Sequence, residues 1–447
     1  MTGRERIFAA LDGMRPDRTP WVPFAGVHGG KLCGFTAREV STDLTKLEKA
    51  LEQVNRLYVP DGQPVMFDLQ IEAEILGCQL VWSEDAPPSV NTHPLKDTTE
   101  IPARIPQPDE GRLPMELEAI RFARKKFPDT AIYAVCAGPF TLAGHLRGTD
   151  VFMDMALDPD YVEELLAYTT KVVKAVSGYL IDAGADVVAV TDPLVSQISP
   201  DFFEDFMDGP FTEIFDSIRS KGARSAFFVC GNATRSIEPM CNTHPDAISI
   251  DENVNLPAAK LITDKHNVCI CGNIPLTSVM LFGTQQDNAK YILDMEESID
   301  ASHLYIASPG CDMPYDIPVE NTIAAEQAVH QPETAALMVR DYKPEELVFH
   351  GSLPDYEHLS RPLVEVFTLD SATCAACTYM KAAAIDAQEN YGSEIDVVEY
   401  KYTSVENIAR CKAMGVKQLP SIYINGKLAF SSIIPDRETL IKAIKEA

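Results

Sequence analysis

Short apolar runs alternate with longer segments of helical periodicity from Thr19 to about His330. This alternation is typical of a parallel sheet whose strands are joined by crossover helices. The clearest helical segment covers residues 161–183, where apolar residues recur every three or four positions. We predict eight strands, in the stretches PWVPFAG from Pro20, PVMFDL from Pro64, AIYAVCAG from Ala131, ADVVAVTDP from Ala185, ARSAFFVCGN from Ala223, AISIDE from Ala247, NVCICGN from Asn267 and HLYIASPGC from His303.

Eight strands that are each followed by a helix predict an α/β fold of the (β/α)₈ TIM-barrel type. This fold places its active site at the carboxyl ends of the strands. The predicted strand ends carry the side chains of His28, Asp68, Cys136, Asp192, Cys230, Asp251, Cys271 and Cys311. We therefore look for the chemistry of the protein among these residues.

The pattern changes after about His330. Residues 331–362 are rich in proline and charge and lack a clean period, as expected of a last helix that runs into a linker. From Leu363 a second, shorter α/β pattern begins, in the order β-α-β-α-β-β-α. We predict a barrel domain over 1–335, a linker over 336–361 and a small α/β domain over 362–447.

Composition and charge narrow the classes of function. The chain has 447 residues, 46% of them hydrophobic, and its amino terminus is charged throughout where a signal peptide would need an apolar centre. Because no apolar run reaches the length of about 18 residues that a membrane span needs, we predict a cytoplasmic protein with no membrane partner. The net charge of -28 would repel nucleic acid, so we predict no nucleic-acid partner either.

The small domain contains a Cys-x-x-Cys pair, Cys374 and Cys377, between its first strand and a helix. A helix amino terminus lowers the pKa of the first thiol, and the short spacing lets the second thiol close on it. The last 85 or so residues resemble thioredoxin-like and glutaredoxin-like domains, and Pro420 stands where that family has a cis-proline facing the thiols. The intervening Ala375-Ala376 differs from the usual Gly-Pro, so the redox potential does not carry over. A docking role without redox chemistry, or a zinc site that includes Cys411, are the alternatives.

The barrel has its own set of recognisable stretches. They are RERIFAALDGMRPDRTPWVP, FDLQIEAEILGC, CAGPFTLAGHLRG, TDPLVSQISPDFFEDFM, VCGNATRSIEPM, ISIDENVNL, GNIPLTSVMLFGT and SPGCDMPYDIPVENT, in this order. Together they resemble the uroporphyrinogen decarboxylase superfamily, and most of all its corrinoid-dependent methyltransferase branch. The decarboxylase itself is disfavoured, because it needs arginines after the first strand and the corresponding stretch VPFAGVHGGKLCG has none.

The resemblance implies a zinc site held by a His-x-Cys pair and a distant cysteine, which keeps an acceptor thiol deprotonated. Cys230 and Cys311 match the two cysteines, whereas Phe228 occupies the histidine position. We predict His28 as the further metal ligand, ahead of Glu72, Glu74 and Cys271. The alternative for Cys230 and Cys311 is that both are buried cysteines that merely pack at strand ends.

Several other polar residues are candidates for the site. Asp192 and Asp251 are predicted to be catalytic, as general bases or substrate anchors, or else to cap the helices that follow them. The predicted substrate-binding residues are His28, Glu74, Asn232, Asn273 and His145. For the two asparagines, which sit in Cys-Gly-Asn triplets, a role in a turn is the alternative.

We therefore predict an enzyme, a corrinoid-dependent methyltransferase that moves a methyl group between a corrinoid and a small substrate or thiol acceptor with the help of zinc. The chain has no Asp-x-His-x-x-Gly motif, so the corrinoid is expected on a partner protein. The alternative function is a thiol-disulfide redox protein, with Cys374 and Cys377 as its reactive pair and a barrel that recognises a small thiol or a tetrapyrrole.

Overall fold

The computed structural model describes residues 1–345, 347–371, 375–391 and 394–447. It contains two compact units, which we treat separately. The first is formed by Met1–Val195 and Ser199–Lys343, and the second contains Pro344–Ala447. Within the described ranges, none of the helices combines the length and the apolar character needed to cross a bilayer.

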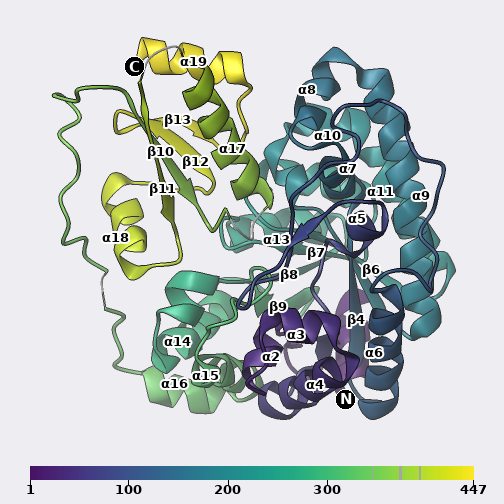
Figure 1. The fold of residues 1–447 in the computed structure, drawn as a ribbon. Helices are drawn as coiled ribbons and strands as arrows, with labels where there is room; N and C mark the ends of the chain where they lie inside the picture. Colours follow the sequence, from purple (N-terminus) through teal and green to yellow (C-terminus); the bar gives the residue numbers. More distant parts are fainter. Residues whose placement is uncertain (346, 372–374, 392–393) are drawn as a thin grey trace. The chain divides into compact units, whose positions relative to one another are not determined.

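A curled parallel sheet forms the centre of the first unit (Figure 1). In the described residues it has seven strands in the order β1-β4-β5-β6-β7-β8-β9, and every neighbouring pair is parallel. The strands are β1 (Gly62–Pro64), β4 (Ala131–Ala137), β5 (Val187–Thr191), β6 (Arg224–Val229), β7 (Ala247–Ile250), β8 (Cys269–Ile274) and β9 (Tyr305–Pro309). The predicted α/β barrel class is confirmed.

The first predicted strand is reduced to a single parallel bridge between Trp21 and Ala307 of β9. The carbonyl oxygen of Trp21 also accepts hydrogen bonds from the amides of Asp61 and Gly62, next to β1. This segment therefore links the two edges of the sheet. It cannot form a longer ladder because Pro20 and Pro23 lack an amide hydrogen.

The second predicted strand was placed a few residues too far along the chain. The ladder covers Gly62–Pro64, and the apolar residues that follow it, up to Phe67, are buried without belonging to a strand. Their burial on the inside of the barrel explains the error, because an apolar run alone does not distinguish a strand from a buried loop.

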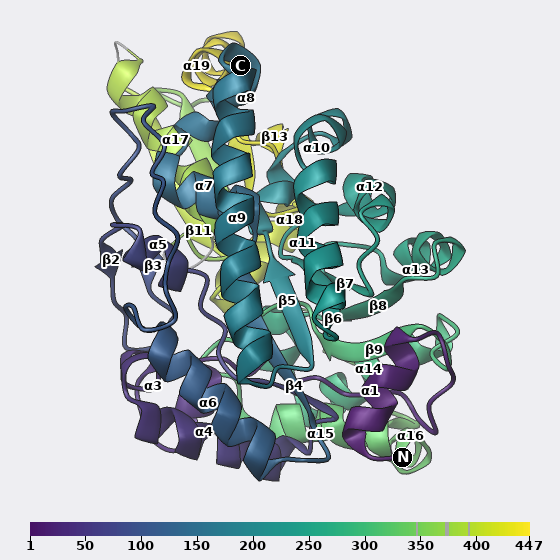
Figure 2. The same ribbon diagram turned by 90° about the vertical axis from the view of Figure 1, so that its right-hand side faces the viewer.

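Helices cover the outside of the sheet, and the long α9 packs beside α11 (Figure 2). The helices of this unit are α1 (Gly3–Leu11), α2 (His28–Lys31), α3 (Ala37–Thr42), α4 (Leu44–Tyr58), α5 (Ile71–Ile75), α6 (Leu113–Lys126), α7 (Pro139–Arg147), α8 (Asp150–Leu157), α9 (Pro159–Ala183), α10 (Pro200–Phe206), α11 (Asp208–Ser220), α12 (Ile237–Asn242), α13 (Leu256–Lys265), α14 (Gln285–Glu297), α15 (Val319–His330) and α16 (Pro332–Val339). Short helical turns and a small hairpin complete it, at η1 (Pro193–Gln197), η2 (Thr234–Ser236), η3 (Leu276–Leu281), β2 (Leu80–Val81) and β3 (Ser89–Val90).

Aromatic side chains fill the inside of the barrel. Phe228 of β6 lies with its ring centre 4.8 Å from that of Phe24 and 5.5 Å from that of Phe67, and Phe24 also contacts Tyr133 of β4 at 6.2 Å. All four rings belong to one buried cluster that includes small residues from the other strands. The barrel is therefore closed by a packed core, and the space for chemistry lies above it, at the carboxyl ends of the strands.

The second unit is a thioredoxin-type domain with a sheet in the order β11-β10-β12-β13. Its elements are β10 (Leu363–Thr368), α17 (Ala375–Asn390), β11 (Asp396–Lys401), α18 (Val405–Met414), β12 (Ser421–Ile424), β13 (Lys427–Ser431) and α19 (Arg437–Glu446). The peptide bond before Pro420 is cis, the geometry that the resemblance implied. Asn425 and Gly426 both have positive φ and form the two-residue turn between β12 and β13.

Candidate functional site

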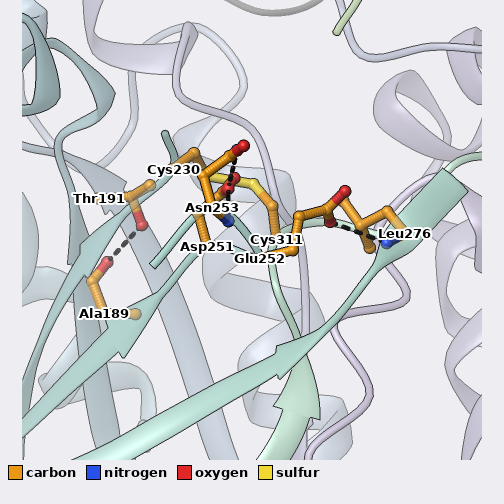
Figure 3. The surroundings of a disulfide bond; sticks show 8 residues. All are labelled: Ala189, Thr191, Cys230, Asp251, Glu252, Asn253, Leu276 and Cys311. Carbon is orange, nitrogen blue, oxygen red and sulfur yellow. Dashed lines mark hydrogen bonds between the residues drawn. A yellow bond between two sulfur atoms is a disulfide. The ribbon is translucent and has the colours of Figure 1, made fainter. Parts of the chain in front are cut away.

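Two cysteines meet at the carboxyl-terminal mouth of the barrel. Cys230 follows the last residue of β6, Cys311 lies two residues after β9, and the two form a disulfide (Figure 3). Their Cα atoms are 6.0 Å apart although 81 positions separate them in the sequence. Because β7 and β8 lie between β6 and β9 in the sheet, the disulfide joins strand ends that are not neighbours.

The local sequence explains how the two sulfurs reach each other. Ala226 and Phe228 of β6 point into the barrel core, and Cys230 continues this alternation and packs on the same core. Gly231 ends the strand with a φ of 97°, which favours glycine. On the other side, a Cβ at Gly310 would lie 2.8 Å from the amide nitrogen of Glu252, so glycine lets the chain before Cys311 approach the end of β7.

The residues around the disulfide do not fit the predicted zinc ion. Phe228, at the position of the family histidine, is fully buried among Phe24 and Phe67 and carries no donor atom. Across the part of the chain that the structure describes, no three His, Cys, Asp or Glu side chains are grouped so that they could hold a metal ion. A structural or catalytic zinc site needs at least three protein ligands, and the cysteine pair supplies two.

His28, the predicted third ligand and substrate contact, has other partners. Its Nδ1 lies 2.9 Å from the carbonyl oxygen of Tyr315, and its Nε2 lies 2.6 Å from the hydroxyl of Tyr58. Since a carbonyl oxygen can only accept, Nδ1 donates there and Nε2 accepts from Tyr58. Burial lowers the pKa of His28 to about 4, so the ring is neutral. His28 thus fixes α2 against the loop after β9, and these contacts give no support to its predicted roles as metal ligand and substrate contact.

The other ligands considered for the metal are also engaged or buried. Glu74 accepts a hydrogen bond of 2.8 Å from Nε of Arg112, which also pairs with Asp68. Glu72 is buried, and this burial raises its pKa to about 7. Cys271 belongs to the barrel core. The structure thus places Glu74 in an ion pair beside α6 and gives no support to its assignment as a substrate contact.

Two adjacent carboxyl groups lie beside the disulfide, at the end of β7 (Figure 3). Oδ1 of Asp251 accepts a hydrogen bond of 2.8 Å from the amide of Asn253, and Glu252 accepts one of 2.8 Å from the amide of Leu276. Burial raises the pKa of Asp251, and burial together with the charge of Asp251 raises the pKa of Glu252 to about 8. Glu252 can therefore take up or release a proton near neutral pH, next to two sulfur atoms.

Asp192 lies at the end of β5 but serves as a helix cap. Its carboxylate accepts hydrogen bonds from the amides of Phe140 at 2.9 Å and Thr141 at 3.0 Å, and from the hydroxyl of Thr141 at 2.6 Å. These donors form the first turn of α7, whose own cap residue, Gly138, has no side chain. Of the two readings of Asp192, the structure favours the cap, although the capped helix is α7, which follows the neighbouring strand β4, and not the helix after β5.

Of the remaining predicted contacts, the two asparagines have structural partners. The side-chain amide of Asn273 donates to the carbonyl oxygens of Asp251 at 3.0 Å and Val254 at 2.8 Å, and so holds the loop after β7. Asn232 accepts a hydrogen bond of 3.0 Å from the amide of Thr234, as in a turn. His145 is buried in α7, where burial lowers its pKa to about 4. For both asparagines the turn or loop reading fits the contacts.

In the thioredoxin-type domain, Cys377 is fully buried and its sulfur accepts a hydrogen bond of 3.3 Å from the amide of Leu369. Cys374 lies outside the described residues. The Cys-x-x-Cys pair is therefore characterised here by its second member alone.

Sequence reasoning missed two carboxyl groups at the mouth. Glu252 follows Asp251 directly, and neighbouring residues of a strand point to opposite faces. After the strand has ended, this alternation no longer applies. Asp312 follows Cys311 in the same way and accepts a hydrogen bond of 2.9 Å from the amide of Gly26. The signal available for both was their place next to a predicted site residue.

Comparisons with known families divide the chain as the two units do. Residues 2–332 match the family model described as Uroporphyrinogen decarboxylase (URO-D). Residues 363–445 match a model described as Thioredoxin domain.

Among the characterised relatives of the barrel are methyltransferases that use methylcobamides. A methylcobamide:CoM methyltransferase of Methanosarcina acetivorans is 28% identical over 322 residues, which are 69% of this chain and 92% of the relative. A second one, from Methanosarcina barkeri, is 27% identical over 334 residues, which are 72% of this chain and 95% of the relative. A uroporphyrinogen decarboxylase of a Wolbachia species is 29% identical, over 49% of this chain and 64% of the relative.

A solved structure supports the same fold. The methyltransferase from Methanosarcina mazei superposes with a TM-score of 0.68 and 24% sequence identity. The match covers 74% of this chain and 99% of that protein.

Proposed function

Because the chain belongs to the uroporphyrinogen decarboxylase (URO-D) family, we propose that it is a methyltransferase that moves a methyl group between a corrinoid and a small thiol. The observation that carries the proposal is the extent of the match to the methylcobamide:CoM methyltransferases, which includes more than nine tenths of their length. The corrinoid is brought by a partner protein, since the chain lacks the corresponding binding motif.

Decarboxylation of a porphyrinogen is the less suitable activity. A porphyrinogen carries several carboxylates, and arginines are the residues that bind such groups in a bidentate way. The stretch after the first strand instead forms α2, with the sequence HGGK. Its one cation, Lys31, pairs with Asp316 at 3.1 Å.

The residues at the mouth suit the transfer of a methyl group to a thiol. Phe24, Phe67 and Phe228 form an apolar floor that excludes water from below. A bound methylcorrinoid supplies an electrophilic methyl group. The attacking thiol must lose its proton, and the position of Asp251 and Glu252 beside the cysteine pair supports them as the acceptors. We assign no zinc ion to this step, because Phe228 and His28 leave the cysteine pair without a third ligand.

The alternative reading, a redox protein whose barrel only recognises a substrate, is not favoured. The relatives that match the whole barrel are transferases. The Cys-x-x-Cys domain is then an addition to a transferase, and its chemistry is considered below.

The proposal is tested by incubating the reduced full-length protein with methylcobalamin and 2-mercaptoethanesulfonate and measuring the methylated thiol by mass spectrometry. We expect formation of the thioether in proportion to the enzyme. Asp251→Asn should lower the rate by about 100-fold, because it removes a proton acceptor. Asp300→Asn is the matched control, since Asp300 is exposed, accepts a hydrogen bond from the nearby Ser302 hydroxyl at 2.6 Å and lies 3.8 Å from Arg15.

Two results would contradict the proposal. One is the absence of methyl transfer to this and other small thiols with an intact fold. The other is a rate of methyl transfer that Asp251→Asn and Asp300→Asn change equally, which would show that the mouth of the barrel is not the site.

A further inference from the structure

The disulfide at the barrel mouth differs from the other cysteines of the chain. Seven other cysteines with described surroundings are free thiols, and they are Cys33, Cys78, Cys136, Cys241, Cys269, Cys271 and Cys411. Cys33 is half-buried and the other six are buried. Cys230 and Cys311 are both only partly buried, and they lie at the carboxyl-terminal mouth of the barrel. Accessible disulfides are the ones that react, whereas structural ones resist reduction.

The position of Cys230 and Cys311 in the fold also supports a reactive role. The strands β6 and β9 are already connected through β7 and β8 by continuous parallel ladders, so the barrel does not need the bridge to bring them together. The bridge instead lies at the one end of the barrel where this fold carries out chemistry. Asp251 and Glu252 beside it offer a place for the protons that two thiols carry.

We propose that Cys230 and Cys311 form a redox-active centre in the barrel, which reacts by thiol-disulfide exchange with a vicinal dithiol. This inference does not rest on the methyltransferase activity, because the exchange is complete without a methyl group. It adds to the chain a second reaction, with a dithiol as its substrate.

The exchange is a two-electron reaction in two steps. The thiolate of the dithiol attacks one sulfur of the bridge, the bond between Cys230 and Cys311 breaks, and a mixed disulfide forms while the other cysteine leaves as a thiolate. The second thiol of the dithiol then attacks the mixed disulfide and releases the first cysteine. The dithiol is oxidised to its disulfide, and its two protons pass to Cys230 and Cys311.

The same chain carries a vicinal dithiol motif in its thioredoxin-type domain. Cys377, the second thiol of this motif, is buried and accepts a hydrogen bond from Leu369, as suits a thiol that closes a disulfide after its partner has reacted. The dithiol that reduces the barrel comes either from this domain or from a separate dithiol protein. The chemistry is the same in both cases, and the experiment below distinguishes the two sources.

The test uses the full-length protein equilibrated in mixtures of reduced and oxidised dithiothreitol. Free thiols are blocked by alkylation and assigned by peptide mass spectrometry. We expect Cys230 and Cys311 to change together, both blocked in the reduced mixtures and both protected in the oxidised ones, in the folded protein. Cys33, which is half-buried but outside the site, is the internal control and should be alkylated in every mixture.

The source of the electrons is found by trapping the mixed disulfide. In Cys377→Ser the second step cannot occur, so an adduct between the peptide of Cys374 and that of Cys230 or Cys311 should accumulate if this chain supplies the dithiol. If a separate protein supplies it, the adduct should form only with an added thioredoxin whose second cysteine is replaced by serine. Cys33→Ser should behave as wild type in both arms.

Three results would overturn the proposal. The first is alkylation of Cys230 and Cys311 in all mixtures, which would mean that they do not pair. The second is a bridge that resists dithiothreitol until the chain is unfolded, which would make it a structural disulfide. The third result is that neither arm of the trapping experiment yields an adduct. In each case methyl transfer by the reduced protein can still be measured, so failure here and failure of the proposed function are distinguishable.

Discussion

At position 228 the side chain points into the barrel, on the same face of β6 as Cys230. The resemblance to methyltransferases implied a histidine there, and the structure shows what the phenylalanine does in its place. It packs against Phe24 and Phe67, so that three aromatic rings occupy the space below the cysteine pair. Position 228 offers no imidazole to the cysteine pair, and the sulfurs of Cys230 and Cys311 bond to each other.

This argument predicts that Phe228→His restores a metal site. The reduced variant would present one imidazole and two thiolates on one side of the mouth, and we expect it to hold about one zinc per chain where the reduced wild type holds little. Zinc is measured by elemental analysis after dialysis. The matched control is Phe227→His, on the same strand, because Phe227 faces Phe211 of α11 at 4.1 Å and points away from the mouth.

Equal zinc content in Phe228→His and Phe227→His would contradict this account of the site. A wild-type protein that already holds one zinc would contradict it as well. The buried imidazole should also cost stability, because it replaces an apolar ring in a packed core.

At the scale of elements, the alternation of strands and helices was predictable because each strand of a parallel barrel is buried on both faces and reads as a continuous apolar run. The first and last residues of the elements were less predictable. The first strand shrinks to a bridge at Trp21, since Pro20 and Pro23 lack the donors that a ladder needs. The second ends at Pro64, and the buried apolar run after it belongs to a loop. The helix predicted over 161–183 begins two residues earlier, at Pro159.

Asp192 connects two elements, and its replacement tests whether it caps α7 or takes part in catalysis. In Asp192→Ala the amides of Phe140 and Thr141 and the hydroxyl of Thr141 lose their acceptor inside the protein. We expect a loss of about 3 kcal/mol in the free energy of unfolding, measured with urea. Asp158→Ala removes an exposed cap from α9 and is the control, with an expected loss of about 1 kcal/mol.

Activity separates the two roles of Asp192 further. If it only caps α7, the rate per folded molecule of Asp192→Ala should stay within a few-fold of wild type. A loss of activity without loss of stability would return Asp192 to the catalytic residues.

At the scale of the whole molecule, the stability of the barrel should fall as the pH rises from 6.5 to 8.5. Burial raises the pKa of Glu72, Asp192 and Glu296 to about 7 and that of Glu252 to about 8. In this range the folded barrel binds protons that the unfolded chain has already released. Raising the pH therefore favours unfolding, by on the order of 1 kcal/mol for each such group.

The measurement is urea unfolding followed by tryptophan fluorescence, which reports on the barrel because both tryptophans, Trp21 and Trp82, lie in it. Glu72→Gln removes one of the titrating groups and should flatten the dependence on pH. Buried His28 and His145, whose pKa values are lowered to about 4, oppose the trend only below pH 6.5. A stability that rises between pH 6.5 and 8.5 would contradict the prediction.

The α/β barrel, the second α/β unit and the residues at the strand ends could be predicted from the sequence, because periodicity and the succession of elements are local properties of the chain. The pairing of Cys230 with Cys311 across 81 positions, the contacts of His28 with Tyr58 and Tyr315, and the helix cap at Asp192 became visible only in the fold. They could not be predicted because the partner of a side chain depends on how distant segments pack. A pattern within one segment does not predict which side chains lie opposite it in the folded barrel.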